Sequence, residues 1–169
     1  MIGKSLITIA GKAALANASS NGRSIKPKYF KFSNQDLEIN ENLNKNDIQG
    51  FIQKDISLYR TFDANTVEFT CDVTPDEADD YTRLAGLYLE DGTLFMVAEP
   101  PYAFPPELRQ TFKIQIVYQN ATGLFDFQYL PYSYEENTLV MFDVSFTLGL
   151  QEIENARQLG LIKNKLGVK

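Results

Sequence analysis

The residues best suited to chemistry lie in an acidic stretch, TPDEADDY at positions 74–81, which holds four carboxylates within five positions. Such a stretch could ligate a cation or supply the acid and base of a hydrolase, with Asp76, Asp79 and Asp80 as candidates. A calcium loop, however, needs spaced ligands and a turn glycine, which are missing here. A carboxyl acid also needs burial that raises its pKa, whereas acidic runs are usually solvated. We therefore expect a surface turn with no metal and no cofactor, in a protein that is not an enzyme.

The rest of the composition also argues against catalysis. The chain has no histidine, which removes the commonest general base and metal ligand. Its single cysteine, Cys71, alternates onto the apolar side of a predicted strand, which indicates a small core residue. The net charge of −6 and the lack of a Lys/Arg cluster argue against nucleic acid as a partner. No apolar run reaches the length needed for membrane insertion.

A β-hairpin with the sequence LAGLYLEDGTLFMVAEPP is the centre of the expected fold. Its Asp-Gly pair at 91–92 separates two apolar runs, and glycine supplies the positive φ of a tight turn without a Cβ clash. With these two residues as the loop, Leu87 faces Met96 across the ribbon. Tyr88 then faces Phe95 as an aromatic cross-strand pair. One face carries Ala85, Leu87, Leu89, Leu94, Met96 and Ala98. Because the other face is apolar too, both must be covered, by the protein's own layers or by another subunit.

An alanine-rich helix is predicted before the hairpin, at residues 5–19, with Thr8 or Ser5 as its N-cap and an αL residue at Asn21-Gly22 as its end. Its buried face is expected to carry Leu6, Ile9, Ala10, Ala13 and Ala14. Further strands are predicted at residues 24–33, 51–59, 66–73, 108–119, 124–130 and 138–148. In the strand at 66–73 apolar and polar residues alternate, which indicates half burial. An Asn-rich loop at 34–47 is expected at the surface.

The last part of the chain combines a strand with a predicted helix at residues 149–165, in which Arg and Lys come late and suit the C-terminal dipole. Four apolar residues there share no single helical stripe: Leu159, Leu161, Ile162 and Leu166. Left exposed on a monomer they would form a sticky patch, so we predict that they bind a partner. The expected fold class is mainly β (α+β). It comprises an antiparallel β-sandwich-like domain with an N-terminal helix at residues 1–134, and a C-terminal strand plus helix at 135–169.

Three landmarks follow one another in an order that resembles a known family. They are the small-residue helix IAGKAALAN at 9–17, the strand at 25–33 after an Asn-Gly turn, and the hairpin AGLYLEDGTL with its exit Pro100-Pro101-Tyr102. Together they resemble the N-terminal, tail-attaching domain of the phage tail-collar fibre proteins of contractile-tailed phages. Two departures are present. Asn34-Gln-Asp36 replaces the family's glycine-aspartate-glycine turn, and too few residues follow the match for a long shaft and a receptor-binding tip.

The resemblance implies a virion structural protein at the tail baseplate, which attaches tail fibres or forms their base and is made in the cytoplasm of the bacterial host. Its implied partners are other tail, baseplate or tail-fibre proteins, together with copies of itself in a trimer or around the tail axis. The alternative is a small adhesin of the tail tip that binds glycans through Tyr59, Tyr102, Tyr132 or Tyr134. The chain has no tryptophan, which counts against this alternative.

Overall fold

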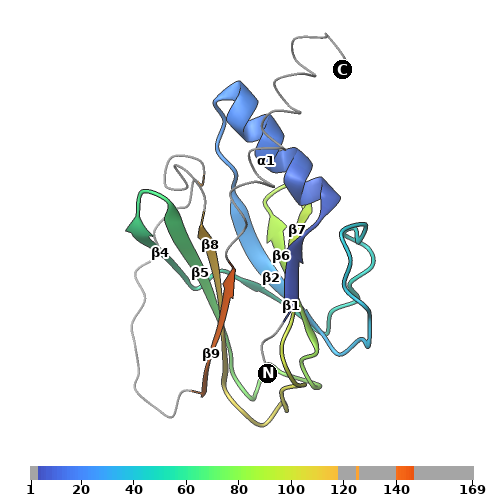
Figure 1. Cartoon of the computed structure of the whole chain (residues 1–169). Helices are drawn as coiled ribbons and strands as arrows, with labels where there is room; N and C mark the ends of the chain where they lie inside the picture. Colours follow the sequence, from blue (N-terminus) through green and yellow to red (C-terminus); the bar gives the residue numbers. More distant parts are fainter. Residues whose placement is uncertain (1–3, 118–124, 126–139, 147–169) are drawn as a thin grey trace.

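A computed structural model describes residues 4–117, 125 and 140–146 of the chain (Figure 1). Its elements are β1 (Lys4–Ile7), α1 (Ile9–Asn21), β2 (Pro27–Ser33), β3 (Ile52–Asp55), β4 (Leu58–Asp63), β5 (Thr66–Val73), β6 (Leu84–Leu89), β7 (Leu94–Glu99), β8 (Gln110–Val117) and β9 (Val140–Phe146). One sheet has the order β1-β7-β6-β2-β3 and the other the order β4-β5-β8-β9. Neighbouring strands are antiparallel except β8 and β9, which run parallel. The prediction of a mainly β fold with an N-terminal helix is confirmed, while the predicted C-terminal helix lies outside the described residues.

The core lies between the two sheets and is rich in aromatic rings. Phe32 in β2 and Phe112 in β8 bring their ring centroids to 4.6 Å across the layers. The ring of Phe125 lies 5.8 Å from that of Phe69 in β5 and 6.0 Å from that of Phe95 in β7. All five side chains are at least nine-tenths buried. Each sheet therefore buries its apolar face against the other, as the alternating pattern of the strands requires.

The helix α1 begins after Thr8, because residues 4–7 form β1 and pair with β7. Of the two predicted N-caps, Ser5 and Thr8, the second is therefore confirmed, and residues 5–7 form a strand instead of helix. Thr8 is the N-cap, and its hydroxyl accepts a hydrogen bond from the backbone N of Gly11 at 2.9 Å. The backbone N of Thr8 in turn donates to the carbonyl of Phe95 at 3.1 Å, which ties the start of the helix to β7. The αL end is confirmed at Gly22, with a φ of 62°.

The face of α1 that packs on the sheet also differs from the predicted one. Gly11, Leu15 and Ala18 are buried, whereas Ile9 is 54% exposed and Ala10 lies at the surface. The reason is the close approach at Gly11, where a Cβ would lie only 2.2 Å from the carbonyl oxygen of β7's residue 95. Only glycine fits there, so Gly11 fixes which face turns inward and leaves an alanine-rich face outside.

The turn between β6 and β7 contains three residues instead of the predicted two. The backbone N of Leu89 donates to the carbonyl of Thr93 at 2.9 Å, and the N of Gly92 donates to that of Leu89 at 3.0 Å. Residues 90–92 therefore form the loop, with Gly92 at a φ of 82°. Glycine occupies the left-handed position, as three-residue hairpin loops require.

The longer loop changes the pairing of the hairpin near its turn. Leu87 faces Met96 as predicted, but Tyr88 faces Leu94, because the register shifts between residues 87 and 88. Phe95 is thus the extra residue of a bulge, and the predicted Tyr88–Phe95 pair is wrong. The bulge turns Phe95 into the core between the sheets and Leu94 to the opposite face, the reverse of their predicted placement.

That opposite face of the hairpin is covered by the chain itself. Tyr88 stacks on Tyr29 with ring centroids 4.9 Å apart, and buried Leu43 and Ile48 from the Asn-rich loop pack in the same cluster as Val97. The loop is therefore a cover as well as a surface segment, since its few apolar residues close the second face. Of the two covers allowed by the sequence, own layers or another subunit, the first is found for the described residues.

The predicted strand at 51–59 divides into β3 and β4, which belong to different sheets. Ile56 between them is buried, and its backbone N donates to the carbonyl of Lys28 at 3.0 Å. A second difference concerns β5, in which both faces are buried and the prediction of half burial is wrong. Two of its polar residues accept hydrogen bonds across the sheet: Gln115 Nε2 donates to Glu68 Oε2 at 2.9 Å, and the hydroxyl of Thr111 donates to Asp72.

Candidate functional site

The acidic stretch at 74–81 is built around a local cap. Glu77 Oε2 accepts hydrogen bonds from the backbone N of Thr74 at 3.0 Å and from its hydroxyl at 2.9 Å, and it pairs with the ammonium of Lys54 in β3. Burial alone would raise the pKa of Glu77, but the hydrogen bonds from Lys54 and Thr74 outweigh it and hold the pKa below its usual value. Glu77 therefore acts as an ionised anchor that fixes the loop on the neighbouring sheet.

The other carboxylates of this stretch do not form an acid–base pair. Asp76 and Asp79 are exposed, and Asp80 accepts hydrogen bonds from the side chain of Asn34 and from the backbone N of Tyr81. Within the described residues, no group of three or more His, Cys, Asp or Glu side chains is placed to hold a metal ion. The stretch is a surface turn in which Glu77 and Asp80 bind the turn itself and also Lys54 and Asn34 of neighbouring segments.

Removal of the Glu77 anchor should have a pH-dependent effect. Because its folded pKa is lowered, the carboxylate stabilises the fold above the unfolded value of 4.5, and this contribution is lost as the pH falls through the folded pKa. We expect Glu77→Gln to unfold at lower urea concentration than the parent protein at about pH 7, and the difference to shrink at about pH 3. Glu107→Gln, at another exposed carboxylate, is the control, and an equal effect in both variants would contradict the assignment.

The thiol and the tyrosines considered from the sequence are placed as follows. Cys71 is fully buried, and desolvation raises its pKa to about 12, so it is a core residue and not a nucleophile. Tyr59 is half-buried, with its ring 5.4 Å from that of Phe69, whereas Tyr102 is 56% exposed. The other two tyrosines, Tyr132 and Tyr134, lie outside the described residues, as do the predicted partner-binding residues Leu159, Leu161, Ile162 and Leu166.

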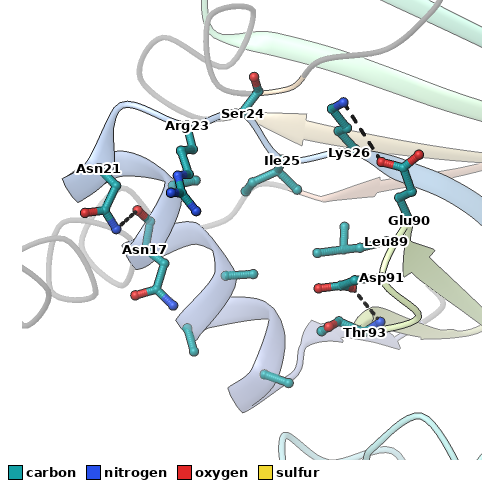
Figure 2. Close-up of a pocket in the computed structure, with 14 residues that line it drawn as sticks. Asn17, Asn21, Arg23, Ser24, Ile25, Lys26, Leu89, Glu90, Asp91 and Thr93 are labelled. Carbon is teal, nitrogen blue, oxygen red and sulfur yellow. Dashed lines mark hydrogen bonds and ion pairs between the residues drawn. The ribbon is translucent and has the colours of Figure 1, made fainter. Parts of the chain in front are cut away.

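A groove of about 760 Å³ opens between α1, the segment at 23–26 and the turn at 89–93 (Figure 2). The side of α1 that adjoins its buried face forms one wall. This wall carries Ala10, Ala13, Ala14, Asn17, Ala18 and Asn21. Buried Ile25 and Leu89 contribute the largest apolar side chains of the lining. Because Gly11, Leu15 and Ala18 face the sheet, the methyl groups along the adjoining side of the helix line the groove.

Charged side chains surround this apolar lining. Glu90 and Asp91 stand on the hairpin turn, and Arg23 and Lys26 stand on the segment that leads into β2 (Figure 2). Lys26 Nζ lies 4.0 Å from Glu90 Oε2, and the backbone N of Glu90 donates to the carbonyl of Lys26 at 2.8 Å. Asp91 Oδ1 accepts from the backbone N of Thr93 at 2.9 Å, which holds the turn in shape. The groove thus has fixed walls, an apolar lining and a rim with both signs of charge.

These features suit the binding of another chain segment. Methyl groups and two aliphatic side chains favour an apolar ligand segment, and the charged rim can orient it.

No protein-family model matches this chain, and no curated protein or solved structure shows a significant match to it. No helix in the described part of the chain is long and apolar enough to cross a membrane.

The groove was missed from the sequence for a specific reason. The alanine-rich stripe predicts a buried face, because small residues are typical of close helix–sheet packing. Close packing is present, but it uses Gly11 on the other side of α1. Glycine at position 11 was the available signal, since a single glycine within an alanine-rich helix often marks the point of closest backbone approach.

Proposed function

We propose that this protein is a structural component of a phage tail, which attaches tail fibres at the baseplate or forms their base. The supporting observation is that the three landmarks of the resemblance form one packed unit. β1 and the N-cap of α1 bond to β7, and β2 pairs with β6, so helix, strand and hairpin are joined directly. Such a unit is suited to present a fixed surface to a partner. The proposed location is the virion, after synthesis in the bacterial host cytoplasm.

The proposed partners are other tail, baseplate or tail-fibre proteins, with the chain present as a trimer or in several copies. Both faces of the hairpin are covered by the chain itself, one by the core between the sheets and the other by the Asn-rich loop. The hairpin therefore gives no reason to expect a second subunit. We therefore base the proposed assembly on the four predicted partner-binding residues, Leu159, Leu161, Ile162 and Leu166. Their apolar side chains would need cover in any folded state of the protein.

Assembly can be tested by changing those residues in place. Leu161→Lys with Leu166→Lys is expected to leave the β fold intact and to reduce incorporation into tail particles, because two charges cannot be buried at an apolar contact. Incorporation is measured by quantitative mass spectrometry of purified particles. Lys163→Arg with Lys165→Arg is the matched control and should be incorporated normally. Normal incorporation of both double variants would show that the partner contact lies elsewhere.

A second candidate function, a glycan-binding adhesin, is favoured by one surface. Tyr81, at the end of the acidic stretch, is 47% exposed, and Tyr102 is 56% exposed. The two loops that carry them are joined by the bridge between Thr82 and Phe104, and they lie at the end of the molecule away from α1 (Figure 1). Exposed aromatic faces next to carboxylates suit sugar rings and their hydroxyl groups. Tyr102→Ala should then abolish retention on bacterial surface polysaccharide, while Tyr59→Phe, at a half-buried ring, should not change it. Unchanged retention of Tyr102→Ala would remove this candidate.

A further inference from the structure

The groove beside α1 offers an apolar surface of the length of a short helix. Its alanine-rich wall extends from Ala10 to Asn21 along α1, which corresponds to about 17 Å at the rise of an α-helix. Ala10 and Ala13 are exposed there, and small side chains on one helix allow a second helix to approach closely. The shape of the groove therefore suits an amphipathic helical segment lying against α1.

The chain contains one segment of this kind beyond its described strands. Residues 149–166 are predicted to be mostly helical, and three of the four predicted partner-binding residues, Leu159, Ile162 and Leu166, follow a spacing of three and four that places them on one side of the helix, while Leu161 lies on the other. A helix of 17 residues spans about 25 Å, so this segment is long enough to follow the whole wall. An isolated helix of that length is marginal in water, and burial of its apolar residues would stabilise it.

The strand that precedes the segment points toward the end of the molecule where the groove lies. β9 runs toward the end of the molecule that carries α1, and its last residue, Phe146, is in register with Ile116 of β8 (Figure 1). Phe125 packs on β5, the next strand of that sheet, and pairs with Ile25. Because Ile25 lines the groove, this series of contacts links the sheet that contains β9 to the groove.

The charges favour one direction for the segment. Its acidic residues, Glu152 and Glu154, come early, and its basic residues, Arg157, Lys163 and Lys165, come late. In the groove, Arg23 comes just after the C-terminal end of α1. Asp91 lies toward the N-terminal end of α1, because β7 follows Asp91 closely and the N-cap Thr8 donates a hydrogen bond to the carbonyl at the start of β7. When the segment runs antiparallel to α1, its early acidic side chains come toward Arg23 and its late basic side chains come toward Asp91. The same direction places the start of the segment toward Ile25, at the end of the molecule toward which β9 runs.

We propose that in the free protein residues 149–166 of the same chain bind in this groove, antiparallel to α1. The side chains predicted to bind a partner are then covered by the protein itself until a partner displaces them. Tethering gives such an internal contact an effective concentration in about the millimolar range, which a second copy reaches only at high protein concentration. The inference rests on the groove and the segment and does not require the proposed tail function.

Cysteine cross-linking of the full-length protein tests this placement. In the antiparallel alignment Leu159 comes opposite Ala13, so Ala13→Cys with Leu159→Cys should form an intramolecular disulfide under mild oxidation. The control, Asp79→Cys with Leu159→Cys, places the first thiol on a loop at the other end of the molecule (Figure 1). Buried Cys71 should not interfere, because its thiol is fully enclosed. Peptide mapping by mass spectrometry identifies the linked residues.

The disulfide of the Ala13/Leu159 pair is expected to form at least about tenfold faster than that of the control pair, through the tethered effective concentration. Adding Ala10→Arg, which places a long charged side chain in the groove on an exposed helix position, should bring the rate down to that of the control. Equal rates for the two pairs would overturn the proposal. Linked dimers in place of the internal disulfide would also overturn it, since they would show that a second copy supplies the segment.

Discussion

Leu87→Asp is expected to unfold the protein. Leu87 is fully buried in the core between the sheets and faces Met96 in the paired hairpin. An unpaired carboxylate there loses its hydration and gains no partner, while the lost leucine leaves a cavity. Both costs amount to several kcal/mol, against a total stability of about 5–15 kcal/mol for a domain of this kind. Circular dichroism during thermal unfolding should show no cooperative transition.

The matched control is Leu108→Asp, the same substitution at a leucine that is 43% exposed. Its carboxylate stays hydrated, so we expect the melting temperature to change little. Two variants that melt like the parent protein would contradict the placement of the hairpin in the core. If both unfolded, the loss would reflect a general intolerance of charge and not burial at Leu87.

Gly11→Ala should have the second largest effect. A Cβ at this position would lie 2.2 Å from a backbone carbonyl oxygen of β7 and 2.8 Å from Ile7 Cγ2. Because the nearest atom is backbone, no rotation of a side chain relieves the contact, and α1 must move away from the sheet. Such overpacking costs about 1–3 kcal/mol, which exceeds the gain of at most about 1 kcal/mol from replacing a helical glycine. Urea unfolding should show the net loss.

Asn17→Ala separates the close contact from helix propensity. Asn17 is exposed on the groove side of α1, so alanine there should raise the stability slightly or leave it unchanged. If Gly11→Ala stabilised the protein as much as Asn17→Ala, the approach of α1 to β7 would be looser than described. The two positions lie on opposite sides of one helix and therefore test which face turns inward.

The sequence predicted the strands of the core because their apolar residues alternate strictly. In β2, for example, successive side chains point to opposite faces. Phe30 and Phe32 therefore lie on one side and Tyr29 on the other. The bulge at Phe95 was not predictable in this way. A two-residue and a three-residue turn both place glycine at a positive φ, and the choice between them depends on packing against Phe125, far away in sequence. One inserted residue was enough to exchange the faces of Leu94 and Phe95.

The start of α1 shows a similar limit. Ser5 to Ile7 continue the helical pattern of small and apolar residues, yet they pair with β7 because its backbone offers hydrogen bonds at the edge of the sheet. Thr8 decides the boundary through its cap, and threonine was one of two capping residues that the sequence offered. The groove depends on which face of α1 turns outward, and Gly11 decides this through its close approach to β7.

The central claim, that the protein is a structural part of a phage tail, is tested most directly by locating it in the particle. Antibodies against this chain, applied to purified particles from its source and viewed by electron microscopy with gold labels, report its position. We expect the labels to collect at the baseplate, where fibres join the tail, in several copies per particle. Particles that carry no label there, while the antibody detects the free protein in the same lysate, would contradict the claim.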